Sequence, residues 1–296
     1  MIKIAAFSDA HFPKLVGIKG LKVLRNSVNN IDPDYVVIAG DLTEGEKESF
    51  EIFLKEFEEI DCPKLICLGN HDLWVQSFEE ATSLEKMEEF IEMGESFGYH
   101  MLDNKPFLEK DIGFAGTVGW YDYSFADPQF PIKDIENKIL FYKGDTFAAS
   151  WWNDRFYFRL KKRNPLMEMT FTEDDNFFVD SLKIPRSSRE EDTYFTKLCY
   201  KHLNKSLNKI KDAKIKIAVI HHLPFKELLN IGREKTIESL FFNAYMGSKC
   251  FGELMIEKKV DICICGHTHR DVRRKIHGIE VYNVSEIKRG IKKIEV

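Results

Sequence analysis

Three short apolar runs in the first 70 residues are each followed at once by polar residues. The runs read IKIAAF (2–7), YVVIAG (35–40) and KLICLG (64–69). Their length suits buried β-strands, and the segments between them have the spacing of amphipathic helices. This alternation predicts a parallel sheet in which the carboxyl ends of all three strands face one edge, where ligands of such sheets bind.

The residues that follow these runs carry carboxylate, imidazole and amide groups, which can bind metal ions. They are Asp9 and His11 after the first run, Asp41 after the second, and Asn70, His71 and Asp72 after the third. The same arrangement returns late in the chain, where IKIAVI (215–220) and DICICG (261–266) are each followed by two histidines. These are His221 and His222 after the earlier run, and His267 and His269 after the later one. We therefore expect side chains from five strand ends to meet in one crevice.

The chain is long and apolar enough to bury a large core. With 296 residues, 44% of them hydrophobic, it is predicted to form a single α/β (α+β) domain over residues 1–296. Residues 120–190 break the alternation and are rich in aromatic and turn residues, so we expect an insertion there that forms a cap beside the crevice. Trp120, Tyr121 and Tyr123 at its start have two explanations, a pocket wall and ordinary core packing.

Charge and composition exclude several classes of protein. A net charge of -5 is unlike the basic surface of a dedicated nucleic-acid coat. No apolar run approaches the roughly 18 residues that a membrane helix needs. The first apolar run reaches Asp9 too soon for a signal peptide, and the six cysteines form no CxxC pair. We expect a soluble, cytoplasmic protein that has no membrane partner.

Each polar motif has an ordinary structural explanation when it is taken alone. Asp41 could be a turn residue or a helix N-cap, and an Asn-His-Asp turn could hydrogen-bond its own backbone. The pooled set is harder to explain in this way, because oxygen and imidazole donors converge without any cysteine. Such donors suit Mn, Fe, Zn, Co or Ni in divalent or trivalent form. The candidate ligands are Asp9, His11, Asp41, Asn70, His221, His267 and His269. Seven ligands are too many for one ion and suit two ions that share a bridging carboxylate.

The ordered motifs DAH, GD, GNHD, a strand-end HH and GHTH resemble those of the calcineurin-like metallophosphoesterase family. The resemblance implies a four-layer αββα sandwich of two mixed sheets flanked by helices. The motifs extend from residue 9 to residue 269, whereas the aromatic-rich insertion matches nothing in the family pattern. The resemblance further implies one ion held by Asp9, His11, Asp41 and His269, and a second held by Asp41, Asn70, His221 and His267. Asp41 would be the bridge.

The histidine pair leaves an alternative open. His221 directly ends the strand and matches the family ligand, while His222 could take its place in another register. Adjacent strand residues point to opposite faces, which favours His221 as the ligand. His222 would then contact the ligands from outside or face the substrate.

The family resemblance also implies a reaction, the hydrolysis of a phosphate ester by a hydroxide that bridges the two ions. His71 has no place among the ligands and is assigned to the leaving-group oxygen, as a proton donor or a stabiliser of charge. Asp72 is expected to orient its imidazole. The expected substrate is a small phosphomonoester or phosphodiester, with nucleotides and cyclic nucleotides among the candidates.

Two other functions compete with this prediction. The segment RFYFRLKKRNP (155–165) has five basic and three aromatic residues and no acid, a composition that suits single-stranded nucleic acid and would make the protein a nuclease. A solvated basic face of the cap is the favoured explanation, because acidic residues follow nearby at 173–175. The second alternative is a non-catalytic scaffold that binds proteins, but every expected ligand position is filled, which favours an enzyme.

Overall fold

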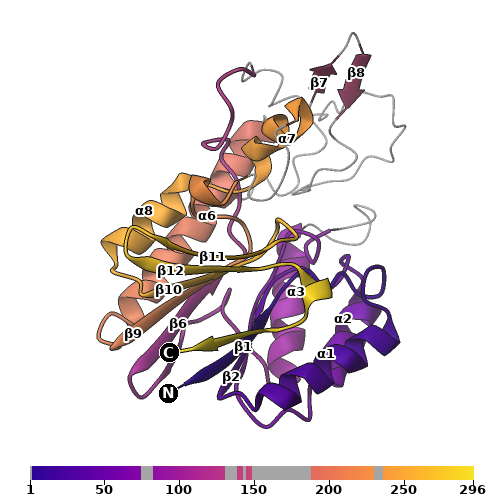
Figure 1. The fold of residues 1–296 in the computed structure, drawn as a ribbon, viewed down its shortest axis with the longest axis vertical. Coiled ribbons are helices and arrows are strands. Elements are labelled where there is room, and N and C mark those ends of the chain that lie inside the picture. Colours follow the sequence, from indigo (N-terminus) through magenta and orange to yellow (C-terminus); the bar gives the residue numbers. More distant parts are fainter. Residues whose placement is uncertain (1, 75–82, 131–138, 143–144, 149–187, 230–235) are drawn as a thin grey trace.

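Two β-sheets pack face to face, and helices cover the outer face of each, so that the chain forms four layers (Figure 1). The computed structural model describes residues 2–74, 83–130, 139–142, 145–148, 188–229 and 236–296. The predicted sandwich of two mixed sheets flanked by helices is confirmed.

The first sheet combines the N-terminal part of the chain with its last strand. Its strands, in their order across the sheet, are β13 (Lys292–Glu295), β1 (Lys3–Phe7), β2 (Tyr35–Ala39), β3 (Lys64–Cys67) and β4 (His100–Met101). β1 to β4 run parallel, and β13 is antiparallel to β1. The three apolar runs near the N-terminus are therefore β1, β2 and β3, as predicted.

The second sheet contains both of the late runs. Its strands, in order, are β11 (Asp271–Ile276), β12 (Ile279–Val284), β10 (Ile262–Cys265), β9 (Ile215–Ile220), β6 (Ile112–Thr117) and β5 (Phe107–Glu109). The four central strands run parallel, and the two edge strands are antiparallel to their neighbours. The carboxyl ends of β9 and β10 thus lie side by side, as those of β1, β2 and β3 do.

The helices follow the division into two sheets. α1 (Ile18–Ile31), α2 (Lys47–Glu56) and α3 (Ser83–Ser96) cover the first sheet, and α6 (Ser188–Lys209) and α8 (Lys249–Glu257) cover the second (Figure 1). The remaining elements are α7 (Ile237–Phe242), the hairpin of β7 (Ile139–Tyr142) and β8 (Asp145–Ala148), and the 3₁₀ helices η3 (Lys226–Leu228), η4 (Asn243–Tyr245) and η5 (Ile287–Arg289). None of the helices in the described part of the chain is long and apolar enough to cross a membrane.

Strand β1 shows why the strands read as unbroken apolar runs. Ile4 and Ala6 belong to the core cluster between the two sheets, while Ala5 and Phe7 belong to the cluster beneath the helices. Successive strand residues point to opposite faces. Since both faces of the sheet are covered, every position from Ile4 to Phe7 is buried and apolar.

The start of the expected insertion belongs to the core. Trp120, Tyr121 and Tyr123 are buried, and the Trp120 indole donates a 2.8 Å hydrogen bond to the carboxylate of Asp192 in α6. Core packing is therefore the explanation that holds for these aromatic residues. The basic segment 155–165, on which the nuclease prediction depends, lies outside the described residues.

Candidate metal centre

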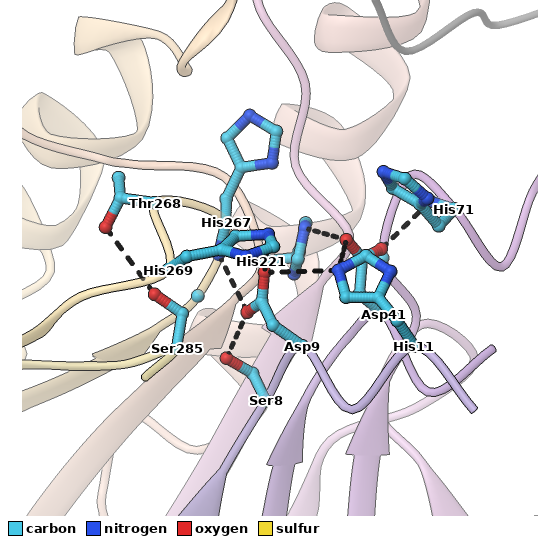
Figure 2. A network of polar contacts seen from close by, with 12 residues as sticks. Ser8, Asp9, His11, Asp41, His71, His221, His267, Thr268, His269 and Ser285 are labelled. Atoms are coloured by element: carbon cyan, nitrogen blue, oxygen red, sulfur yellow. Dashed lines mark hydrogen bonds and ion pairs between the residues drawn. The ribbon is translucent and has the colours of Figure 1, made fainter. Parts of the chain in front are cut away.

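The expected ligands come from loops of both sheets and meet at one edge of the sandwich. In Figure 2 the carboxylates of Asp9 and Asp41 lie between the imidazoles of His11, His221 and His269. Asp9 and Asp41 follow strands of the first sheet, whereas His221 and His269 follow strands of the second. The candidate ligands therefore lie together at the edge where the carboxyl ends of strands from both sheets meet.

One group of donors forms around Asp9. Its Oδ1 lies 3.3 Å from Nε2 of His269 and 3.8 Å from Nε2 of His11. The donor atoms of these three residues all lie within 4.8 Å of one another. A single cation can therefore contact all three.

A second group forms around Asp41. Its Oδ2 lies 3.2 Å from Nε2 of His221, and the donor atoms of Asp41, His221 and His267 all lie within 4.8 Å of one another. The same Oδ2 is 3.5 Å from Nε2 of His11, which belongs to the first group. Asp41 is thus placed to contact cations in both groups.

Several buried polar atoms in these groups support a metal centre. Neither amide atom of Asn70 has a hydrogen-bond partner in the described part of the chain, although the residue is completely buried. The same holds for Oδ1 of Asp9 and for Nε2 of His11 and of His221. An unsatisfied buried polar group costs about 1–3 kcal/mol. Cations satisfy carbonyl, carboxylate and imidazole donors together, so these residues fit the predicted pair of ions.

The electrostatics of the site also favour cations. Burial alone would lower the pKa of His11, but its contacts with Asp9 and Glu44 raise that pKa to about 11. Burial would likewise raise the pKa of Asp41, yet the charges of His221 and His71 hold it well below its usual value. In the metal-free protein, protons on His11 and His221 balance the buried carboxylates, and bound metal displaces such protons.

The backbone that carries the donors is unusual. Positive φ angles occur at five of the seven candidate ligands. These are Asp9 (56°), His11 (43°), Asp41 (55°), His267 (74°) and His269 (55°). The left-handed conformation costs a non-glycine residue about 1–2 kcal/mol. Strained backbone concentrates at functional sites, where the surrounding structure holds it in place.

Two glycines allow the loops of the two sheets to approach closely. A Cβ atom at Gly266, in the second sheet, would lie 2.7 Å from the Ser8 hydroxyl and 2.8 Å from the Ala39 carbonyl oxygen. A Cβ atom at Gly40 would lie 2.6 Å from Nδ1 of His221. Any larger residue at either position would separate the two halves of the site.

His221 and His222 differ clearly in their surroundings. Nδ1 of His221 lies 2.8 Å from the Ala39 carbonyl oxygen, which orients Nε2 toward Asp41. His222 packs against the rings of Trp120 and Tyr121. Burial and the charge of His221 lower the pKa of His222 to about 3, so that its ring is neutral. The geometry favours His221 as the ligand.

A matched pair of substitutions tests this choice. We expect His221→Ala to lower the metal content measured by elemental analysis, because a direct ligand is lost. His222→Ala should keep its full metal content, since its ring is in none of the three groups of possible metal-binding side chains among the described residues. The opposite result would make His222 the ligand.

Glu44 was not among the residues predicted for the site, yet it contacts both His11 and His71. Its Oε1 lies 2.8 Å from Nδ1 of His11 and 3.2 Å from Nδ1 of His71. Although burial raises the pKa of Glu44, the contacts with His11 and His71 lower it below its usual value. The one signal in the sequence is the position of Glu44, three residues after Asp41 in the same loop.

The carboxylate of Asp72 accepts its hydrogen bonds from the neighbouring loops. Its carboxylate accepts hydrogen bonds from the backbone N–H groups of Leu42, Thr43 and Gly69, at 2.8–3.2 Å, and from the Thr43 hydroxyl. Both of its oxygens are occupied in holding the loops after β2 and β3 together. Glu44 is the carboxylate that lies beside Nδ1 of His71, and the orienting role of Asp72 stays a prediction.

Asp72→Asn should accordingly destabilise the fold. An amide in place of the carboxylate turns an NH₂ group toward backbone donors, and we expect a loss of about 1–3 kcal/mol in the free energy of unfolding. Denaturant unfolding of the metal-free protein measures it. Asp111→Asn, on an exposed side chain, is the control and should change stability by less than about 0.5 kcal/mol. Equal stability of both variants would contradict the assignment.

Comparisons with known proteins identify the family and a similar fold. The sequence model of a family described as calcineurin-like phosphoesterase matches residues 2–271. Phosphopantetheinyl hydrolase from Mycobacterium tuberculosis has a similar structure, with a TM-score of 0.64 and 15% identity over 99% of this chain and 95% of that one. A protein of Thermus thermophilus has a TM-score of 0.50 and 12% identity, over 99% of this chain and 98% of its own. No curated protein matches the chain.

Proposed function

The chain belongs to the calcineurin-like phosphoesterase family, and we propose that it hydrolyses a small phosphomonoester or phosphodiester at two metal ions. Its membership makes it a metal-dependent hydrolase of phosphate esters. The family depends on a dinuclear centre, and the described residues include groups of side chains that can hold the ions. Nucleotides and cyclic nucleotides are among the substrates proposed.

The proposed ligand assignment divides the site into two. Asp9, His11, Asp41 and His269 would hold one ion, and Asp41, Asn70, His221 and His267 the other. The contacts of the shared Oδ2 of Asp41 with His11 and His221 support its role as the bridge. When bound, two such ions lower the pKa of a water molecule and neutralise the charge on phosphoryl oxygens.

His71 is proposed to serve the leaving group. Oε1 of Glu44 lies 3.2 Å from Nδ1 of the ring, and Nε2 is proposed to donate a proton to the departing oxygen. The backbone N–H of His71 donates a 2.9 Å hydrogen bond to Oδ1 of Asp41. Asp41 therefore ties the position of the proton donor to that of the metal centre.

One observation carries this proposal, the convergence of three overlapping groups of possible metal-binding side chains, two of which contain Asp41, among buried atoms that lack hydrogen-bond partners in the described part of the chain. The test is an assay of metal-reconstituted protein against an aryl phosphomonoester, a bis-aryl phosphodiester and a panel of cyclic nucleotides. We expect turnover of at least one class with Mn, Fe, Zn, Co or Ni. Absence of turnover with every ion and substrate would favour the binding scaffold instead.

The nuclease prediction remains open to a separate test. A salt-dependent shift of single-stranded DNA or RNA in the presence of the protein would favour it, and no binding at low salt would count against it. We also propose a cytoplasmic location, because all six cysteines are free thiols, as is usual in reducing compartments.

A further inference from the structure

Trp74 stacks on the imidazole of His71. The two ring centroids are 3.7 Å apart, and the planes differ by 29°. This is the one ring contact that Trp74 makes with the described residues. The indole thus covers one face of the proposed proton donor.

The backbone explains how the two rings meet. The N–H of Leu73 donates to the carbonyl of Asn70, and the N–H of Trp74 donates to the carbonyl of His71. In such a turn, side chains three residues apart lie one above the other. The turn itself is fixed by Asp72, whose carboxylate binds backbone groups of both neighbouring loops.

The indole is not placed there by the hydrophobic core. Leu73 is completely buried and belongs to the core cluster, whereas Trp74 is half-buried and belongs to neither core cluster. Nε1 of Trp74 makes no hydrogen bond within the described part of the chain. Among the described residues, the stack on His71 and the backbone of the turn are the contacts that define its position.

Three of the described side chains lie around the His71 ring. Trp74 lies on its face, His11 meets it edge-on with ring centroids 4.4 Å apart and planes at 81°, and Glu44 lies 3.2 Å from Nδ1. Rotation of a histidine ring about its second side-chain torsion is poorly restricted by intrinsic preference. A carboxylate at one edge permits rocking about that contact, and a stacked ring prevents it.

We propose that Trp74 is a positioning residue for leaving-group protonation, holding the plane of the His71 imidazole so that its Nε2 faces the departing oxygen. The proposal rests on the proposed function of His71. A misplaced proton donor costs most where the leaving oxygen is a strong base, because such a group departs only with a proton. The dependence of turnover on the leaving group is therefore the property that Trp74 controls.

The test compares aryl phosphates with good and poor leaving groups, dinitrophenyl and phenyl phosphate, in metal-loaded protein. For Trp74→Leu we expect kcat with phenyl phosphate to fall by about 10-fold to 100-fold, with KM changed by less than about threefold. The kcat for dinitrophenyl phosphate should change by less than about threefold. Trp74→Phe keeps an aromatic face and should restore most of the activity with phenyl phosphate.

A second arm separates this proposal from a general effect on the fold. In a His71→Ala background, Trp74→Leu should cause no further loss, because the indole acts through the imidazole. His71→Ala should also change the tryptophan fluorescence of metal-free protein, and this change should be absent from the Trp74→Phe background. Equal losses on both esters, or a further loss without His71, would overturn the role of Trp74. A His71→Ala variant that shows no leaving-group dependence would instead overturn the role of His71.

Discussion

Asp41→Asn is expected to lose bound metal and nearly all turnover together. The substitution keeps the shape of the side chain and an oxygen for the N–H of His71, but it removes the charge that contacts His11 and His221. Loss of an outer-shell partner typically costs 10-fold to 100-fold, so loss of the bridge should exceed about 100-fold in turnover. Elemental analysis should give at most one ion per chain in place of two.

Two measurements establish whether loss of the bridging charge is the cause. Asp111→Asn makes the same chemical change on an exposed side chain and should keep full metal content and turnover. Far-ultraviolet circular dichroism of both variants checks that the fold is retained. An Asp41→Asn protein that binds two ions would show that Asp41 is not the bridge.

His71→Ala is expected to separate chemistry from metal binding. Turnover should fall by about 10²-fold to 10⁴-fold, the usual contribution of a general acid, while the metal content stays at that of the unaltered protein. The physical reason is that His71 serves the leaving group and lies outside the seven proposed ligands. Steady-state kinetics and elemental analysis on the same preparation measure both quantities.

Glu44→Gln extends this prediction to the partner of the ring. The amide has the size of the carboxylate but no charge to hold Nδ1 of His71, and we expect a loss of about 10-fold to 100-fold in kcat. His71→Ala with unchanged turnover would remove His71 from the reaction. A Glu44→Gln variant with unchanged turnover would limit the role of Glu44 to support of His11.

The architecture could be predicted from the sequence because strands that are buried on both faces read as continuous apolar runs. Ile4, Ala5, Ala6 and Phe7 are all completely buried, two on each side of the first sheet. The donors could be located because parallel strands deliver their carboxyl ends to one edge. Both the strands and the edge of the sheet follow from the order of residues along the chain.

Glu44 and Asp72 could not be assigned in the same way. Which carboxylate meets His71 depends on the path of two loops, and the loop after β2 contains left-handed backbone at Asp41. Asp72 was predicted as the partner of His71 because it is the next residue in the sequence. In the fold, the Asp72 carboxylate faces backbone N–H groups and Glu44 lies beside the His71 imidazole. Trp120 shows the same difficulty, since an aromatic side chain after a strand suits a pocket wall and a core equally well.

The left-handed backbone at five candidate ligands lowers the stability of the fold while it places the donor atoms of the proposed metal centre. Glycine adopts that conformation freely, so glycine at His269, an exposed position, would relieve strain while it removes a donor. Selection for thermostability alone would therefore favour glycine at these positions, and each substitution would raise the free energy of unfolding by on the order of 1 kcal/mol. At these positions stability and the proposed metal binding make opposite demands on the residue, so directed evolution toward a more heat-resistant protein should begin away from this edge of the sandwich.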